Sequence, residues 1–192
     1  MSVADNYILN NQATNALVIG SEIFSLNIFF ILNSPSLNPR LSDKVFANFK
    51  LSSELYSDGR FYDLLYVDGG VASNQKAGQI KMKGREVFRH AVEKLSECIK
   101  LSLKKNNLKK DNIDWIIPHQ ANKRIMDMTA KKLDISKNKV LITVDRYANT
   151  SSASIPLTLD YALSKKIVKR GQIIVFEAIG GGLTWGCSIL KY

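Results

Sequence analysis

The chain contains few of the residue types on which metal sites and disulfide frameworks depend. Among its 192 residues are two cysteines and two histidines. Two cysteines far apart in the sequence give no disulfide framework, which favours a reducing compartment, and we expect a cytoplasmic protein. His90 and His119 have no Cys-x-x-Cys or His-x-x-x-His spacing beside them. We therefore expect no metal site.

A long uninterrupted apolar run is also absent. The most apolar stretch, residues 23–32, is broken by Ser25 and Asn27, whereas a membrane span needs about 20 apolar residues. No basic segment precedes it as in a signal peptide. We predict a buried strand here and no membrane association. If the elements that usually cover such a strand are missing, the same residues would form an exposed apolar patch.

Acidic residues are outnumbered: 27 basic against 17 acidic residues give a net charge of +10. The basic residues cluster in residues 100–110, 123–132 and 165–170. Most of them are expected on solvated helices and loops. The clusters lack the interleaved aromatic residues of nucleic-acid sites, so we expect no nucleic-acid partner.

The hydrophobic pattern of the second half alternates between helical and strand periods. Helices are predicted at residues 85–106, 121–133 and 153–165, and strands at 114–117, 140–144, 173–178 and 184–190. In the first helix, six residues recur at helical spacing and should be buried: Val87, Ala91, Leu95, Cys98, Ile99 and Leu103. In the second, Ile125, Met128 and Leu133 should partly face inward. The alternation predicts a layered α/β fold with one core.

Polar or glycine-rich groups follow three of these strands. His119 comes after the strand at 114–117, Asn149 after the strand at 140–144, and Gly180 to Gly182 after the strand at 173–178. Ligands of open α/β sheets bind beyond the carboxyl ends of strands. An imidazole and a carboxamide both offer N–H donors, which suits the stabilisation of an enolate or oxyanion.

Each residue also has a simpler interpretation. His119 could be a satisfied polar residue at a strand exit, and Asn149 could cap the following helix. The glycines could form an ordinary turn. Their joint occurrence at successive strand ends favours an active site.

Three motifs carry a family resemblance: Pro118-His-Gln-Ala-Asn122, Asn149-Thr-Ser-Ser-Ala-Ser-Ile-Pro156 and Glu177-Ala-Ile-Gly-Gly-Gly-Leu-Thr-Trp-Gly186. With them, residues from about 57 onward resemble the C-terminal half of β-ketoacyl-acyl-carrier-protein synthase III, the thiolase-fold enzyme that starts fatty acid synthesis. Residues 3–22, with a strand at 16–22, resemble a small part of the N-terminal half. The resemblance implies a truncated thiolase-like fold, with residues 1–50 as a remnant of the N-terminal half and residues 51–192 as the C-terminal domain.

The resemblance also implies a decarboxylative Claisen condensation of acyl-coenzyme A with malonyl-carrier protein, without a cofactor. His119 and Asn149 match the residues that hold the malonyl thioester oxygen, and Gly181 matches a backbone donor to the acyl oxyanion. In the family, the cysteine nucleophile lies just upstream of the segment that matches Val3. Neither Cys98 nor Cys187 matches its position, so this chain is expected to lack the nucleophile.

By the same resemblance, acyl carrier protein binds the stretch formed by Gln120, Ala121, Asn122, Lys123 and Arg124. The pantetheine arm of coenzyme A runs past Gly84, Phe88, Ala121 and Asn122. Lys123 and Arg124 supply positive charge for an acidic carrier and for phosphates. Full-length members of the family are expected to be homodimers.

Residues 25–60 depart from the family pattern, because a Gly-Asp-Gly-Ala-Gly stretch and a further strand are absent. Two hypotheses stay open. The chain is either an enzyme whose N-terminal half comes from elsewhere, or a catalytically incomplete carrier-binding or synthase-pairing subunit or gene remnant. A solitary half would leave a face built for burial exposed, so we expect the isolated chain to associate with itself.

Overall fold

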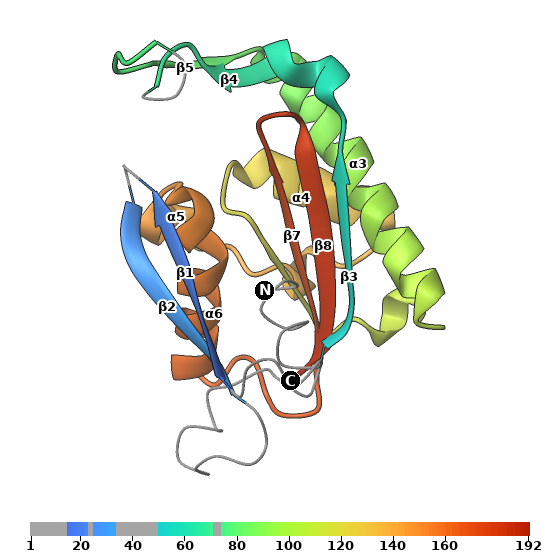
Figure 1. Cartoon of the computed structure of the whole chain (residues 1–192). Helices are drawn as coiled ribbons and strands as arrows, with labels where there is room; N and C mark the ends of the chain where they lie inside the picture. The colour runs from blue at the N-terminus through green and yellow to red at the C-terminus, as the bar shows by residue number, and fades with distance from the viewer. Residues whose placement is uncertain (1–14, 23–24, 34–49, 71–73) are drawn as a thin grey trace.

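The computed structural model describes residues 15–22, 25–33, 50–70 and 74–192. Its centre is a four-stranded sheet in the order β3-β8-β7-β6 (Figure 1). Strands β6 and β7 are parallel, and β8 runs antiparallel to both of its neighbours, β3 and β7. The strands of this sheet are β3 (Lys50–Ser57), β6 (Trp115–Pro118), β7 (Ile173–Gly180) and β8 (Thr184–Lys191).

The other elements of the described chain are helices, two hairpins and short 3-10 turns. The helices are α3 (Gly84–Lys105), α4 (Lys123–Leu133), α5 (Val144–Tyr147) and α6 (Ser154–Ser164). Two hairpins pair β1 (Asn15–Glu22) with β2 (Ser25–Asn33) and β4 (Leu65–Val67) with β5 (Ile80–Met82). Short 3-10 turns are η1 (Gly59–Leu64), η2 (Lys110–Asn112), η3 (Lys137–Lys139) and η4 (Ser151–Ala153).

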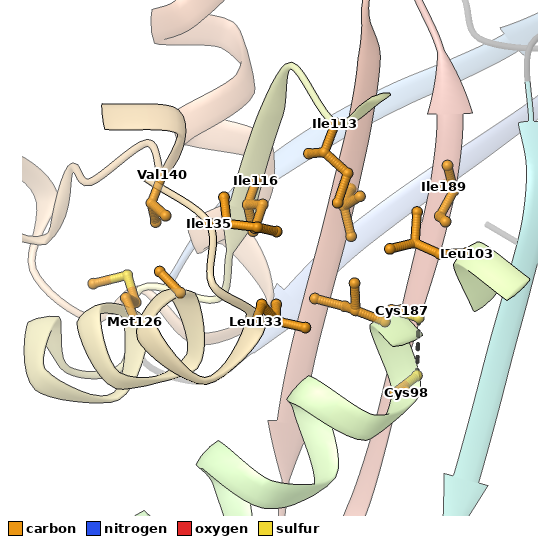
Figure 2. Packing of buried hydrophobic residues seen from close by; sticks show 13 residues of the cluster. Cys98, Leu103, Ile113, Ile116, Met126, Leu133, Ile135, Val140, Cys187 and Ile189 are labelled. Atoms are coloured by element: carbon orange, nitrogen blue, oxygen red, sulfur yellow. Dashed lines mark hydrogen bonds between the residues drawn. The ribbon is translucent and has the colours of Figure 1, made fainter. Parts of the chain in front are cut away.

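Helices α3 and α4 pack on one face of the sheet, where they share the larger apolar core (Figure 2). All six residues predicted to be buried on α3 are buried. The apolar stripe at helical spacing therefore identified the helix and its inner face correctly. Cys98 on α3 meets Cys187 on β8, with the two sulfur atoms 2.9 Å apart (Figure 2). The two cysteines are distant in sequence but adjacent in the core, and both are free thiols.

Helix α6 packs on the opposite face, against Ile117, Ile174 and Phe176. Pro156 lies in its first turn, where no backbone donor is lost. The β1–β2 hairpin lies beside α6 (Figure 1). The two strands predicted near residues 16–32 are thus present, while the predicted burial of the second strand concerns side chains that the structure does not describe. The resemblance of residues 3–14 also lies outside the described residues.

Two expectations about individual elements need correction, one in full and one in part. Residues 140–144 do not form a strand: Val140 makes an isolated parallel bridge to Ile116, and the chain then turns into α5. The side chain of Gln120 accepts the backbone N–H groups of Thr143 and Val144, so these donors are used by a side chain instead of a strand ladder.

The inner face of α4 agrees with the prediction in part, because Leu133 is buried and Ile125 is half-buried, but Met128 is not. Met126, Thr129, Ala130 and Leu133 are buried, whereas Met128 is 40% exposed. The helix begins at Lys123 instead of 121, because the side chain of Asn122 caps it by accepting the backbone N–H of Arg124. Within the described ranges, no helix combines the length and apolar character needed to cross a membrane.

Candidate active site

His119 and the glycine loop follow two parallel strands that end at the same edge of the sheet. Strands β6 and β7 run side by side, with Pro118 in register with Glu177. Directly after β6, the backbone N–H of His119 donates to the carbonyl of Glu177 at 2.8 Å. The glycine loop begins at the end of β7, only three residues after Glu177. The strand ends therefore place His119 next to the strand that leads into the glycine loop.

His119 is half-buried and joins β6 to the start of α6. Its Nδ1 atom lies 2.6 Å from the hydroxyl oxygen of Ser154, the first residue of α6. The 149–154 segment is therefore brought to His119 by a direct contact. This segment also contains Asn149, the second predicted site residue.

Asn149 is exposed, and its Oδ1 accepts the backbone N–H of Ser151 at 2.9 Å. This contact closes a turn at the start of η4, whose N-cap residue is Thr150, and α6 itself starts later, at Ser154. Because Oδ1 accepts within its own loop, the NH2 group is the part of this amide that can donate to another molecule. Ala148 and Ser151 both have positive φ, 57° and 50°. Strained residues of this kind often surround functional groups.

The glycine loop is a tight connection between β7 and β8, closed by the pairing of Gly180 with Thr184. A Cβ atom on Gly181 would lie 2.8 Å from the carbonyl oxygen of Leu65. Gly182 has φ of 132°, a conformation that side chains rarely adopt. The loop thus needs glycine at both positions, and it exposes backbone rather than side chains.

Gln120 has a structural function that the sequence did not indicate. The side chain is buried and makes four hydrogen bonds: it donates to the carbonyls of Pro118 and Leu141 and accepts from Thr143 and Val144. Its expected contact with a carrier protein does not fit this structure, because all of these bonds would have to break.

The other residues of the carrier-binding prediction lie at the surface. Asn122, Lys123 and Arg124 are exposed and Ala121 is half-buried. The guanidinium of Arg124 lies 5.6 Å from the ring centre of Phe88, so the first turns of α3 and α4 are neighbours. This contact brings Phe88 of the predicted tunnel close to the predicted carrier site. Gly84, the first residue of α3, is exposed.

Glu177 is a buried acid that the sequence analysis did not single out. It is 2% exposed, and its Oε2 has no hydrogen-bond partner among the described residues. Burial raises the pKa of its carboxyl group to about 8. A glutamate inside the apolar run Ile173–Ile179 was the available signal. Across the described part of the chain, no group of three or more potential metal-ligating side chains occurs.

Comparisons of the sequence and of the fold with known proteins point to one enzyme family. The model of the 3-oxoacyl-[acyl-carrier-protein (ACP)] synthase III C-terminal region matches residues 103–192. Beta-ketoacyl-[acyl-carrier-protein] synthase III of Paramagnetospirillum magneticum is 44% identical over 207 residues, covering 100% of this chain and 63% of that protein. Residues 103–192 thus form a synthase III C-terminal domain, and the chain as a whole is similar to part of synthase III. A synthase III of Rhodospirillum rubrum is 45% identical over 204 residues, with the same coverage.

Solved synthase III structures share the fold. The crystal structure of the enzyme from Aquifex aeolicus VF5 matches with a TM-score of 0.82 and 33% identity, covering 100% of this chain and 62% of that one. The enzyme from Pseudomonas aeruginosa PAO1 matches with a TM-score of 0.83 and 27% identity, over 97% of this chain and 61% of that one. The α/β, thiolase-like fold is confirmed. The chain spans about 63% of the length of its curated synthase III relatives, and its division at residue 50 stays a prediction.

Proposed function

We propose that this chain carries the decarboxylating part of a synthase III active site. In the complete reaction, an acyltransferase condenses acyl-coenzyme A with malonyl-carrier protein as carbon dioxide leaves, at the start of fatty acid biosynthesis. The observation that supports this most directly is the position of His119, held at the end of β6 by the same segment that carries Asn149. No cofactor takes part in the proposed reaction.

The chemistry follows from the two donors. Loss of carbon dioxide from a malonyl thioester leaves an enolate whose oxygen carries the developing negative charge. N–H donors fixed in advance on such an oxygen lower the barrier, and removing one typically costs about 100-fold or more in rate. The Asn149 amide cannot exchange protons, which suits charge stabilisation. The backbone N–H of Gly181 is proposed as the donor to the acyl oxyanion.

Neither Cys98 nor Cys187 is proposed as the acyl acceptor. Both are buried, and the hydrogen bond that Cys98 donates to Cys187, together with burial, raises the pKa of the Cys98 thiol. A nucleophilic cysteine must instead reach its thiolate form readily. We propose that acylation depends on a cysteine outside the printed sequence, supplied by the same or another polypeptide.

Docking of the carrier protein is assigned to the exposed cations Lys123 and Arg124 at the start of α4. An acidic carrier would be attracted to these charges, and its pantetheine arm would pass the neighbouring Phe88. Assembly as a homodimer and a cytoplasmic location belong to the same proposal.

The test is carbon dioxide release from malonyl-carrier protein by the purified chain. His119→Ala and Asn149→Ala should each abolish release or lower it about 100-fold. His90→Ala is the matched control, because it removes the other imidazole, which lies tilted against the ring of Phe61. Absence of release from a chain that is folded by circular dichroism would contradict the proposal. A binding or synthase-pairing subunit would then be the better account.

A further inference from the structure

Ser154 links the start of α6 to the end of β6 through a single buried oxygen. The residue is 2% exposed. Its Oγ lies 2.6 Å from His119 Nδ1 and 3.2 Å from the backbone nitrogen of Gln120. These are its side-chain partners in the described part of the chain. The hydroxyl therefore bridges the imidazole and a backbone N–H group.

The chemistry of the two partners sets the direction of both hydrogen bonds. The backbone N–H of Gln120 can only donate, so Ser154 Oγ accepts there. The hydroxyl has one proton of its own, and of its two partners only Nδ1 has a lone pair to receive it. Donation to Nδ1 places the proton of the neutral imidazole on Nε2.

Two features of the structure around Ser154 support donation of its hydroxyl proton to Nδ1. Gln120 is immobilised by its four side-chain hydrogen bonds, so its backbone N–H cannot turn away from Ser154. Ser154 also stands at the N-terminus of α6, where the helix dipole is positive. A lone pair on Nδ1 is favoured over a second N–H at that end of the helix.

We infer that Ser154 is a positioning residue that holds His119 as the Nε2–H tautomer. The remaining ring nitrogen then presents a hydrogen-bond donor, as stabilisation of an enolate oxygen requires. The use of that donor rests on the proposed function, whereas the tautomer does not. Ser154 acts through His119 and needs no contact with substrate.

The tautomer is directly measurable because the chain has only two histidines. Nitrogen NMR of the 15N-histidine-labelled chain distinguishes a protonated from an unprotonated ring nitrogen, in solution or, if the chain self-associates, in the solid state. His119→Ala assigns the signals. We expect Nε2–H for His119 in the parent chain, and a mixed or Nδ1–H population in Ser154→Ala. His90 is the internal control for folding, and Ser152→Ala, an exposed serine of the same segment, should change neither signal.

Two results would overturn the inference: an Nδ1–H tautomer in the parent chain, or an unchanged Nε2–H population in folded Ser154→Ala. If Ser154→Ala does not fold, the parent spectrum alone decides. In the decarboxylation assay we expect Ser154→Ala to lower kcat about 10-fold to 100-fold with little change in KM. A parent chain with the expected tautomer but no decarboxylation would refute the proposed function and leave the assignment of Ser154 in place.

Discussion

Gln120 and Asn149 carry the same carboxamide group, and their surroundings give them opposite uses. Gln120 is buried with both ends of its amide hydrogen-bonded, so it fastens the exit of β6 to the segment before α5. Asn149 is exposed, and its oxygen accepts a hydrogen bond within its own loop. Hydrogen-bond satisfaction thus separates a structural amide from one that is available to a substrate.

Gln120→Ala should destabilise the fold. The substitution leaves two carbonyls and two backbone N–H groups without their partner in a buried place, and we expect a loss of about 3 kcal/mol in the free energy of unfolding. Urea unfolding followed by circular dichroism measures it. Asn138→Ala, which removes an exposed carboxamide, should change stability by less than about 0.5 kcal/mol. Equal effects of the two variants would contradict the role given to Gln120.

Glu177 should make stability depend on pH. Burial raises its pKa to about 8 in the folded chain, from 4.5 for an ordinary glutamate. The folded state therefore binds more protons than the unfolded state between these values, and stability falls as pH rises from about 4.5 to about 8, by on the order of 5 kcal/mol. Glu177→Gln should flatten this part of the curve. Identical pH profiles of parent and variant, from thermal unfolding, would show that Glu177 is not the source.

At the scale of elements, the core is assembled by contacts between segments far apart in the chain. Cys98 of α3 and Cys187 of β8 meet beneath the helix and join it to the sheet (Figure 2). The glycine loop likewise fits against Leu65, the first residue of β4. The first contact predicts the reactivity of the two thiols, and the second predicts the effect of a side chain at Gly181.

The two thiols should be unreactive in the folded chain. Both are buried, and the pKa of Cys98 is raised, so little thiolate is accessible to a disulfide reagent. We expect no labelling under native conditions and two labelled thiols in urea, counted by absorbance or mass. Ser152→Cys provides an exposed control that should react at once. Fast labelling of the folded parent chain would contradict the packing of α3 on β8.

Gly181→Ala should disturb the glycine loop. The new methyl group would lie 2.8 Å from the backbone oxygen of Leu65, which cannot move aside as a side chain would. We expect a loss of about 2 kcal/mol. Gly180→Ala is the matched control, because a Cβ there meets nothing within 4 Å. Thermal unfolding of both variants tests the close approach, and equal stabilities would rule it out.

At the scale of the whole molecule, exposed apolar side chains concentrate on β3 and on the β4–β5 hairpin. Leu55 on β3 is 69% exposed and Ile80 on β5 is 65% exposed. Strand β3 also lies at one edge of the sheet in the described part of the chain. Exposed apolar edges of this kind invite pairing with another chain.

We therefore expect the isolated chain to self-associate as its concentration rises. The double variant Leu55→Lys with Ile80→Lys should weaken association about 10-fold or more, because charged side chains on edge strands oppose pairing. Sedimentation velocity at several concentrations measures this. Met128→Lys, at an exposed apolar position on α4, should leave association unchanged. A monodisperse monomer of the parent chain would contradict the prediction.

The sequence by itself determined the α/β class, the positions of α3, β6, β7 and β8, and the residues proposed for the site. These follow from local periodicity and from motifs that need no knowledge of distant neighbours. The positions of His119 and Asn149 at the ends of apolar segments are of the same kind. The tertiary structure decided what depends on contacts across the chain. It converted the predicted strand at 140–144 into a segment held by Gln120, paired Cys98 with Cys187, and placed Ser154 against His119. Hydrogen-bond partners and burial arise only when separate segments pack together, so no local pattern could show them.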